Sequence, residues 1–353
     1  MARRTTRKDE ASQETDRIEG QPHPRETFHL AGQDEALMRA ARAIRSGRPP
    51  QAWLITGPPG TGKATLAYRI ARYLLKYGAR DAGPADLSVP GNDPVAMQVT
   101  AAAHPGLLVL KRGINPDTGR MMSVLSVDEI RRLAGFFGLT SGAGGWRVAI
   151  IDTADEMNPA AANALLKALE EPPARAMLLL LANAPGRLLP TIRSRCQRLA
   201  LRPLAPDILD REITARMPAL GQDERASLAR LAGGSLGLAL QLAGGEGLTL
   251  ADDADHLVEQ AASPDPIALM ALAERIARLK DGLRDFGDVL RWTLEQRIRA
   301  RAHEGGRALR PWVDVWDRLG GAFARADALH LEPRQTILSA GHALAQTARR
   351  EPP

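Results

Sequence analysis

Cysteine is almost absent from this chain of 353 residues. Cys196 is the only one, so neither a disulfide framework within the chain nor a cysteine-based zinc site can form. The seven histidines show no metal-ligand spacing such as H-x-x-x-H. We therefore expect no bound metal, zinc included, and a reducing cytoplasmic setting.

Long hydrophobic runs are also missing. No apolar stretch approaches the ~18 residues that a membrane-spanning helix requires. The N-terminus lacks the apolar region of a secretion signal. These absences favour a cytoplasmic protein that has no membrane partner.

Acidic residues are fewer than basic ones, 41 against 47, which gives a net charge of +6. This balance permits contact with an anionic surface such as nucleic acid. It does not require such contact, because the arginines are dispersed rather than gathered in one block. The length is too great for one ordinary core, so we expect two or three domains.

Four regions can be distinguished along the chain. Residues 1–24 mix charges of both signs with almost nothing to bury, and we expect a disordered tail there. Apolar strand patterns alternate with amphipathic helix patterns over residues 25–203, which predicts an α/β domain. Strand signals then vanish, and we expect a small helical unit over 204–248 and a second one over 249–353.

The α/β region contains three recognisable strands. "QAWLITG" is a short apolar strand that leads into a glycine-rich loop, and the helix pattern "KATLAYRIARYLLKYG" follows and ends at Gly78. "RVAIID" and "AMLLLLAN" are unbroken apolar runs, typical of parallel strands buried on both faces. Between them, Asn158 and Pro159 predict the start of a helix that Pro172-Pro173 end. Residues 79–106 are rich in Pro, Gly and Ala, and we expect an irregular excursion.

The stretch "GPPGTGKAT", residues 57–65, matches the phosphate-loop pattern G-x-x-x-x-G-K-[ST] until its last position. Its backbone amides would hold phosphates, and Lys63 would reach the β- and γ-phosphates. Ala64 stands where a hydroxyl would hold Mg²⁺, and Thr65 lies about 100° further round the helix. The motif thus favours ATP or ADP bound without hydrolysis, and it argues against a firmly held Mg²⁺.

A second motif, the acidic stretch "VAIIDTADE", also argues against ATP hydrolysis. Four apolar residues lead to Asp152, which can orient a metal-bound water at the end of its strand. Many P-loop ATPases place a glutamate next, to polarise the attacking water, but here the residue is Thr153. We interpret Asp155 and Glu156 as structural acids at a helix start.

The run "IIDTADEMNPAAANALLKALEEPP", followed by "LLLLANAPGRLLPTIRSRCQRLALRPL", resembles the AAA+ clamp-loader family of bacterial DNA polymerase III. The resemblance is strong over residues 26–245 and weaker over the C-terminal helices. It implies an α/β AAA+ P-loop NTPase-like domain with a parallel sheet, a small helical lid and an all-α collar domain used for oligomerisation.

The resemblance assigns family roles to individual positions of this sequence. Asp152 matches the Walker B aspartate, Asn183 a polar sensor, and Arg195 of "SRC" the arginine finger that enters the ATP site of a neighbouring subunit. The expected catalytic residue is therefore Arg195, acting in trans. The expected nucleotide-binding residues are Gly57, Pro58, Pro59, Gly60, Thr61, Gly62, Lys63, Ala64, Thr65, Asp152 and Asn183.

Three departures separate this chain from active ATPases of the family: Ala64, Thr153, and Gly237 where such members carry a sensor arginine in G-S-x-R. A four-cysteine zinc module, common in the family, is also missing, which leaves the fold of residues 79–106 open. The resemblance thus implies a non-catalytic clamp-loader subunit that supports its neighbour's ATP hydrolysis. An active ATPase of the gamma/tau type, or another AAA+ remodelling enzyme or helicase, stays open as an alternative.

The resemblance also implies partners. These are gamma/tau-type ATPase subunits, a delta-type clamp-opening subunit, the sliding clamp, and primer–template DNA bound mainly through its phosphates. The expected location is the cytoplasm, at the replisome on the nucleoid.

Overall fold

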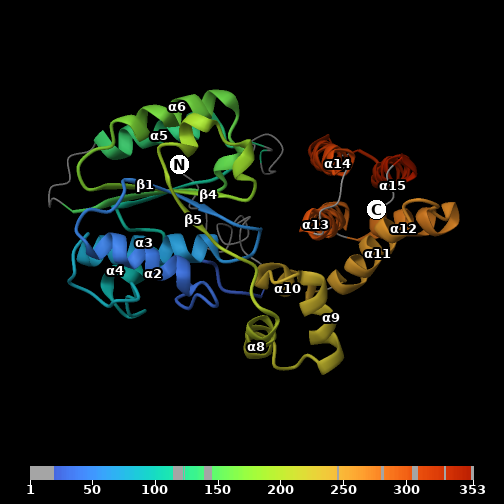
Figure 1. Cartoon of the computed structure of the whole chain (residues 1–353), viewed down its shortest axis with the longest axis horizontal. Helices are drawn as coiled ribbons and strands as arrows, with labels where there is room; N and C mark the ends of the chain where they lie inside the picture. The colour runs from blue at the N-terminus through green and yellow to red at the C-terminus, as the bar shows by residue number, and fades with distance from the viewer. Residues whose placement is uncertain are drawn as a thin grey trace, which may run out of the picture. The chain divides into compact units, whose positions relative to one another are not determined.

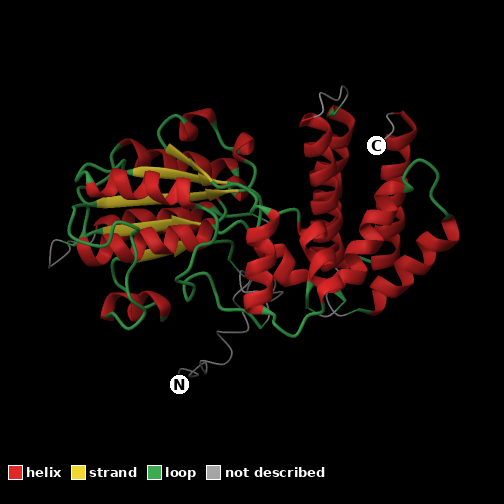
Figure 2. Cartoon of the chain, turned by 60° about the horizontal axis from the view of Figure 1, so that its bottom comes forward, coloured by secondary structure: helices red, strands yellow, loops and turns green. Residues whose placement is uncertain are grey.

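The computed structural model describes residues 20–113, 122, 124–138, 145–244, 246–279, 282–303, 309–329 and 331–350. The chain divides into two compact units. The first runs to Ala219 and includes Gly234–Leu240, and the second comprises Leu220–Gly233 and Gln241 onward. The described strands all belong to the first unit (Figure 2).

The first unit is built on a five-stranded, entirely parallel sheet of order β2-β3-β4-β1-β5. Its strands are β1 (Ala52–Thr56), β2 (Leu107–Leu110), β3 (Arg147–Ile151), β4 (Ala176–Ala182) and β5 (Gln197–Ala200). The predicted fold class, a parallel-sheet P-loop domain of the AAA+ type followed by helices, is confirmed. β2 and β5 have only four residues each, too few for a clear sequence pattern.

Helices cover both faces of this sheet (Figure 1). One layer contains α2 (Asp34–Arg45), α3 (Lys63–Tyr77) and α4 (Pro94–Thr100), and the other contains α5 (Val127–Gly138), α6 (Pro159–Glu170) and α7 (Pro190–Arg193). Side chains alternate along each strand, so Ile55 of β1 packs in the core beneath α3 while Leu54 packs in the core beneath α6.

The predicted helix boundaries beside the site are confirmed. Gly62 and Gly78 flank α3 with φ values of 95° and 72°, which glycine adopts without strain. The Asn158 side chain accepts a hydrogen bond of 2.8 Å from the amide of Ala161, and Pro159 occupies the first turn of α6.

Two expectations about irregular segments need correction. Residues 79–106 include the helix α4, which the Asp93 side chain caps by accepting from the amide of Val95 at 3.0 Å. Of the tail expected over residues 1–24, residues 1–19 lie outside the described part. Residues 20–24 belong to the fold, because His23 is buried with its ring against Tyr68.

From residue 204 onward, the described residues form helices and connecting segments without strands, as predicted. The helices are α8 (Pro206–Arg216), α9 (Gln222–Ala232), α10 (Leu236–Leu242), α11 (Gly247–Glu259), α12 (Pro266–Arg278), α13 (Gly282–His303), α14 (Arg310–Leu329) and α15 (Pro333–Arg350). None of the helices described is long and apolar enough to cross a membrane. The proposed division at residues 203 and 248 stays a prediction.

Candidate nucleotide site and arginine finger

The phosphate loop follows β1 directly and folds on itself. The Lys63 ammonium, at the start of α3, donates hydrogen bonds to the carbonyl oxygens of Gly57 (2.9 Å) and Pro58 (2.7 Å). The Thr61 hydroxyl donates to the same Pro58 oxygen at 2.8 Å. Gly60 has a φ of 72°, a conformation that a residue with a side chain rarely adopts.

The loop presents the backbone amide donors that phosphate binding requires. Within the described part of the chain, the amides of Gly60, Thr61, Gly62 and Ala64 donate to no other group. Successive unpaired amides of this kind form a concave nest for an anion at a helix start. The loop residues therefore fit the phosphates of a nucleotide.

Two other expected residues lie at the same edge of the sheet. Asp152 follows the last residue of β3 and Asn183 follows the last residue of β4, and the Gly57 amide donates to Ala182 at 3.3 Å. Because the strands are parallel, their carboxyl ends meet at one edge. The structure thus brings the loop, Asp152 and Asn183 together.

The acids after Asp152 have structural partners. The two carboxylate oxygens of Asp155 accept from the amides of Asn183 (3.1 Å) and Ala184 (2.8 Å). Glu156 pairs with Arg112 at 2.8 Å and accepts from the Thr153 hydroxyl at 3.2 Å. Asp155 therefore stabilises the turn at Asn183 and Ala184, and neither acid replaces the carboxylate missing at position 153.

The start of α10 packs directly on the phosphate loop, a contact that sequence reasoning missed. The buried Ser235 hydroxyl donates to the Pro59 carbonyl at 2.9 Å, and the Gly237 amide donates to the Gly60 carbonyl at 3.0 Å. A Cβ atom on Gly237 would lie 2.6 Å from the Cα of Gly60. Position 237 therefore admits no side chain in this arrangement, the sensor arginine of active members included.

Arg195 lies elsewhere in the first unit. It stands just before β5, and its guanidinium donates to a carboxylate oxygen of Glu170 (3.0 Å) and to the Thr191 carbonyl (3.1 Å). Glu170 is the last residue of α6, which leads back to the start of β4. Both residues thus lie toward the amino ends of the strands, away from the edge that carries the phosphate loop. Glu170 was not predicted, although it belongs to the "LEEPP" motif that carries the resemblance.

Cys196, next to Arg195, is half-buried, and burial raises the pKa of its thiol to about 11. We expect slow alkylation by iodoacetamide at pH 8, where only about one thiol in a thousand is ionised, and a rate that rises about tenfold per pH unit toward pH 11. The measurement is the labelling rate of the full chain between pH 7 and pH 11, which reports this one cysteine alone. Fast labelling at pH 7 that levels off below pH 9 would contradict the expectation.

A family model and two curated relatives that match this chain are all described as subunits of DNA polymerase III. A family model described as DNA polymerase III, delta subunit, matches residues 32–205. DNA polymerase III subunit delta' of Pseudomonas aeruginosa is 32% identical over 300 residues, which cover 82% of this chain and 86% of that protein. Subunit delta' of Escherichia coli is 35% identical over 208 residues, 58% of each chain.

Two further proteins are similar to this chain at lower sequence identity. DNA polymerase III subunit gamma/tau of Mycobacterium tuberculosis is 30% identical over 202 residues, 55% of this chain and 31% of that one. Among solved structures, a DNA polymerase III gamma subunit-related protein of Thermotoga maritima aligns with a TM-score of 0.42 at 18% identity, over 90% of this chain and 100% of that one.

Proposed function

Because this chain belongs to the DNA polymerase III delta-prime subunit family, we propose that it is a non-catalytic subunit of the sliding-clamp loader. In this role it donates Arg195 as an arginine finger to the ATP site of a neighbouring ATPase subunit. There the guanidinium stabilises the negative charge that develops on the γ-phosphate.

The position of Arg195 carries the proposal. Its guanidinium is exposed at the surface and lies toward the amino ends of the strands, whereas the chain's own phosphate loop lies at their carboxyl ends. An arginine in this place cannot act on a nucleotide bound to its own loop, but a neighbouring subunit can receive it. Glu170 and the Thr191 carbonyl hold the side chain in one orientation before it engages.

The chain's own site supports nucleotide binding rather than hydrolysis. The loop amides and Lys63 would hold the phosphates of ATP or ADP. Ala64 offers no oxygen to Mg²⁺, and the Asp155 carboxylate is taken up by two backbone amides. An active gamma/tau-type ATPase, and an AAA+ remodelling enzyme or helicase, would need a hydroxyl at position 64 and a carboxylate at position 153.

The proposed partners are those of a clamp loader. They are ATPase subunits of the gamma/tau type, a delta-type subunit and the sliding clamp, with primer–template DNA contacted through the assembled complex. The proposed location is the cytoplasm, at the replisome on the nucleoid.

Reconstitution tests this function. The purified chain is mixed with gamma/tau-type and delta-type subunits, and the loading of clamp onto primed DNA is measured with and without it. We expect loading to depend on this chain. Equal loading in its absence would refute the proposal.

Nucleotide binding to the isolated chain can be predicted separately. Lys63→Ala should weaken the binding of a fluorescent ATP analogue by about 10- to 100-fold, because a charge-assisted hydrogen bond to phosphate is worth about 1.5–3 kcal/mol. Removal of Mg²⁺ with EDTA should change the affinity little, since position 64 supplies no ligand. The matched control is Lys167→Ala, which removes an exposed lysine of α6. Binding that is insensitive to Lys63→Ala would contradict a role for the loop.

A further inference from the structure

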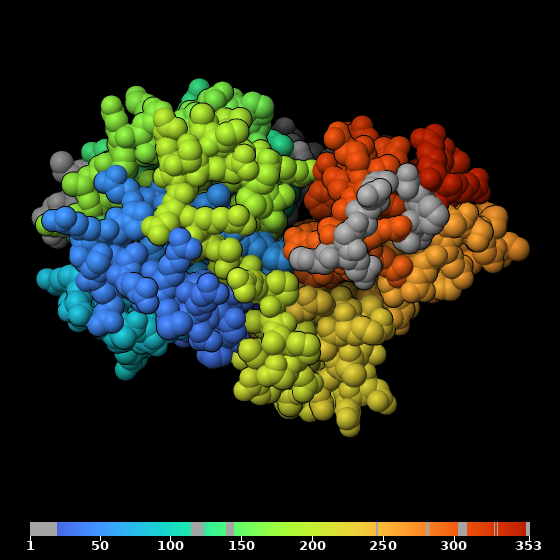
Figure 3. All heavy atoms as spheres, viewed as in Figure 1, coloured from blue at the N-terminus to red at the C-terminus, as the bar shows by residue number. Residues whose placement is uncertain are grey.

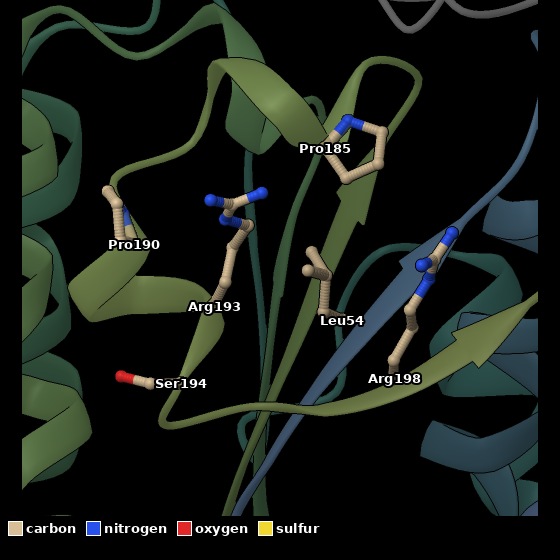
Figure 4. Close-up of a pocket in the computed structure, with 6 residues that line it drawn as sticks. All are labelled: Leu54, Pro185, Pro190, Arg193, Ser194 and Arg198. Carbon is tan, nitrogen blue, oxygen red and sulfur yellow. The ribbon is translucent and has the colours of Figure 1, made fainter.

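A pocket of about 380 Å³ opens on the first unit beside the segment that carries Arg195. It is lined by Leu54, Pro185, Pro190, Arg193, Ser194 and Arg198. Figure 4 shows Leu54 between the two arginines, whose side chains extend toward the end of the pocket where Pro185 lies. The pocket thus combines an apolar floor with two cationic groups.

Neither arginine of the pocket is neutralised within the described part of the chain. The Arg193 guanidinium has no hydrogen bond or ion pair there, and the Arg198 guanidinium donates only to the Thr56 hydroxyl, at 3.1 Å. Thr56 is the last residue of β1, so this bond anchors Arg198 to the strand that leads into the phosphate loop. Two unpaired guanidinium groups on one pocket favour an anionic occupant.

The surrounding chain strengthens this preference. Residues 172–206 contain no aspartate or glutamate and no lysine. They carry six arginines: Arg175, Arg187, Arg193, Arg195, Arg198 and Arg202. Some yellow-green atoms of this stretch are visible at the surface in the space-filling view (Figure 3), whereas β4 within it is buried. Arg195 and Arg202 already have carboxylate partners, Glu170 and Glu35, so the preference for a negatively charged occupant rests on Arg193 and Arg198.

The pocket's other walls indicate what kind of anion it takes. Leu54, Pro185 and Pro190 give it apolar surface, and the neighbouring Leu189 is an exposed large hydrophobic residue. A glutamate or aspartate on a protein surface presents an apolar stem below its carboxylate, whereas a phosphodiester backbone gains nothing from such walls. A protein carboxylate is therefore the better match.

We propose that this pocket is a docking site for an acidic side chain of the ATPase subunit that receives Arg195. The inference rests on the proposed function, because Arg193 lies two residues from Arg195 and a subunit that engages one lies within reach of the other. The carboxylate pairs with Arg193 and Arg198 while its stem packs over Leu54. This docking holds the segment that carries Arg195 against the neighbouring subunit.

The test is the affinity of the full chain for a purified gamma/tau-type subunit at low and high ionic strength. We expect Arg193→Gln and Arg198→Gln each to weaken binding about three- to tenfold at low salt, with a smaller loss at high salt. Arg193→Lys keeps the charge and should retain most of the affinity. The matched control is Arg39→Gln, which removes an exposed arginine of α2, on the opposite face of the sheet.

The other possible results distinguish failure of the docking site from failure of the proposed function. Wild-type affinity in both glutamine variants overturns the docking site and leaves the proposed function standing. Unchanged assembly with weakened primer–template binding by the assembled loader assigns the pocket to a nucleic-acid phosphate, and so also overturns it. Failure of the wild-type chain to bind the ATPase subunit refutes the proposed function itself.

Discussion

Arg195→Ala is expected to reduce ATP hydrolysis at the neighbouring subunit's site by roughly 10³-fold or more, the usual contribution of an arginine finger. The physical reason is the loss of a positive charge from the γ-phosphate as negative charge develops there. The variant should leave the first unit folded, because the side chain is exposed and its ion pair with Glu170 lies at the surface.

The measurement is clamp- and DNA-stimulated ATP turnover by the reconstituted loader, with the wild-type chain or with Arg195→Ala. Arg39→Ala, which removes another exposed arginine side chain, serves as the control and should have no effect. Turnover that stays at the wild-type level with Arg195→Ala would exclude the finger role.

Arg72→Met is expected to lower the free energy of unfolding of the first unit by about 3 kcal/mol. Arg72 is buried in α3 and donates to the carbonyls of Arg25 (2.9 Å) and Thr27 (3.0 Å), and it lies 4.3 Å from the ring centre of Phe28. Burial, with a smaller effect of the Arg69 charge, lowers its pKa to about 10, so it remains charged at neutral pH. Methionine would leave both carbonyls without their donor.

This loss can be measured by urea denaturation followed by tryptophan fluorescence. Arg39→Met on the solvent side of α2 is the matched control, and it should change stability by less than about 0.5 kcal/mol. An equal, small effect of both substitutions would show that Arg72 does not fasten residues 25–28 to α3.

The parts of the fold that the sequence predicted are those specified locally. α6 begins at an Asn-Pro pair and ends before Pro172-Pro173, and the phosphate loop lies between an apolar strand and an amphipathic helix. Each signal lies within one continuous stretch of the chain. α4 was missed although Asp93 and Pro94 provide an equally local start signal, because the surrounding Pro- and Gly-rich sequence obscured it.

The features that the sequence could not predict depend on residues brought together by the fold. Ser235 and Pro59 are 176 residues apart, and their hydrogen bond places α10 on the phosphate loop. The sequence marked Gly237 only as a missing arginine, whereas the structure shows a glycine in direct backbone contact with Gly60. Likewise, Glu170 and Arg195 both lie in recognisable motifs, but only the packing of α6 beside the start of β5 brings them into contact.

In the proposed function, this chain supplies a catalytic arginine but does not hydrolyse ATP itself. The decisive measurement compares the ATP turnover of the purified chain alone, with Mg²⁺, with that of the same chain in the reconstituted loader. We expect no turnover above the blank for the isolated chain and strong, Arg195-dependent turnover in the loader. Robust turnover by the isolated chain, equal in the wild type and in Arg195→Ala, would contradict it and identify an active ATPase despite Ala64 and Thr153.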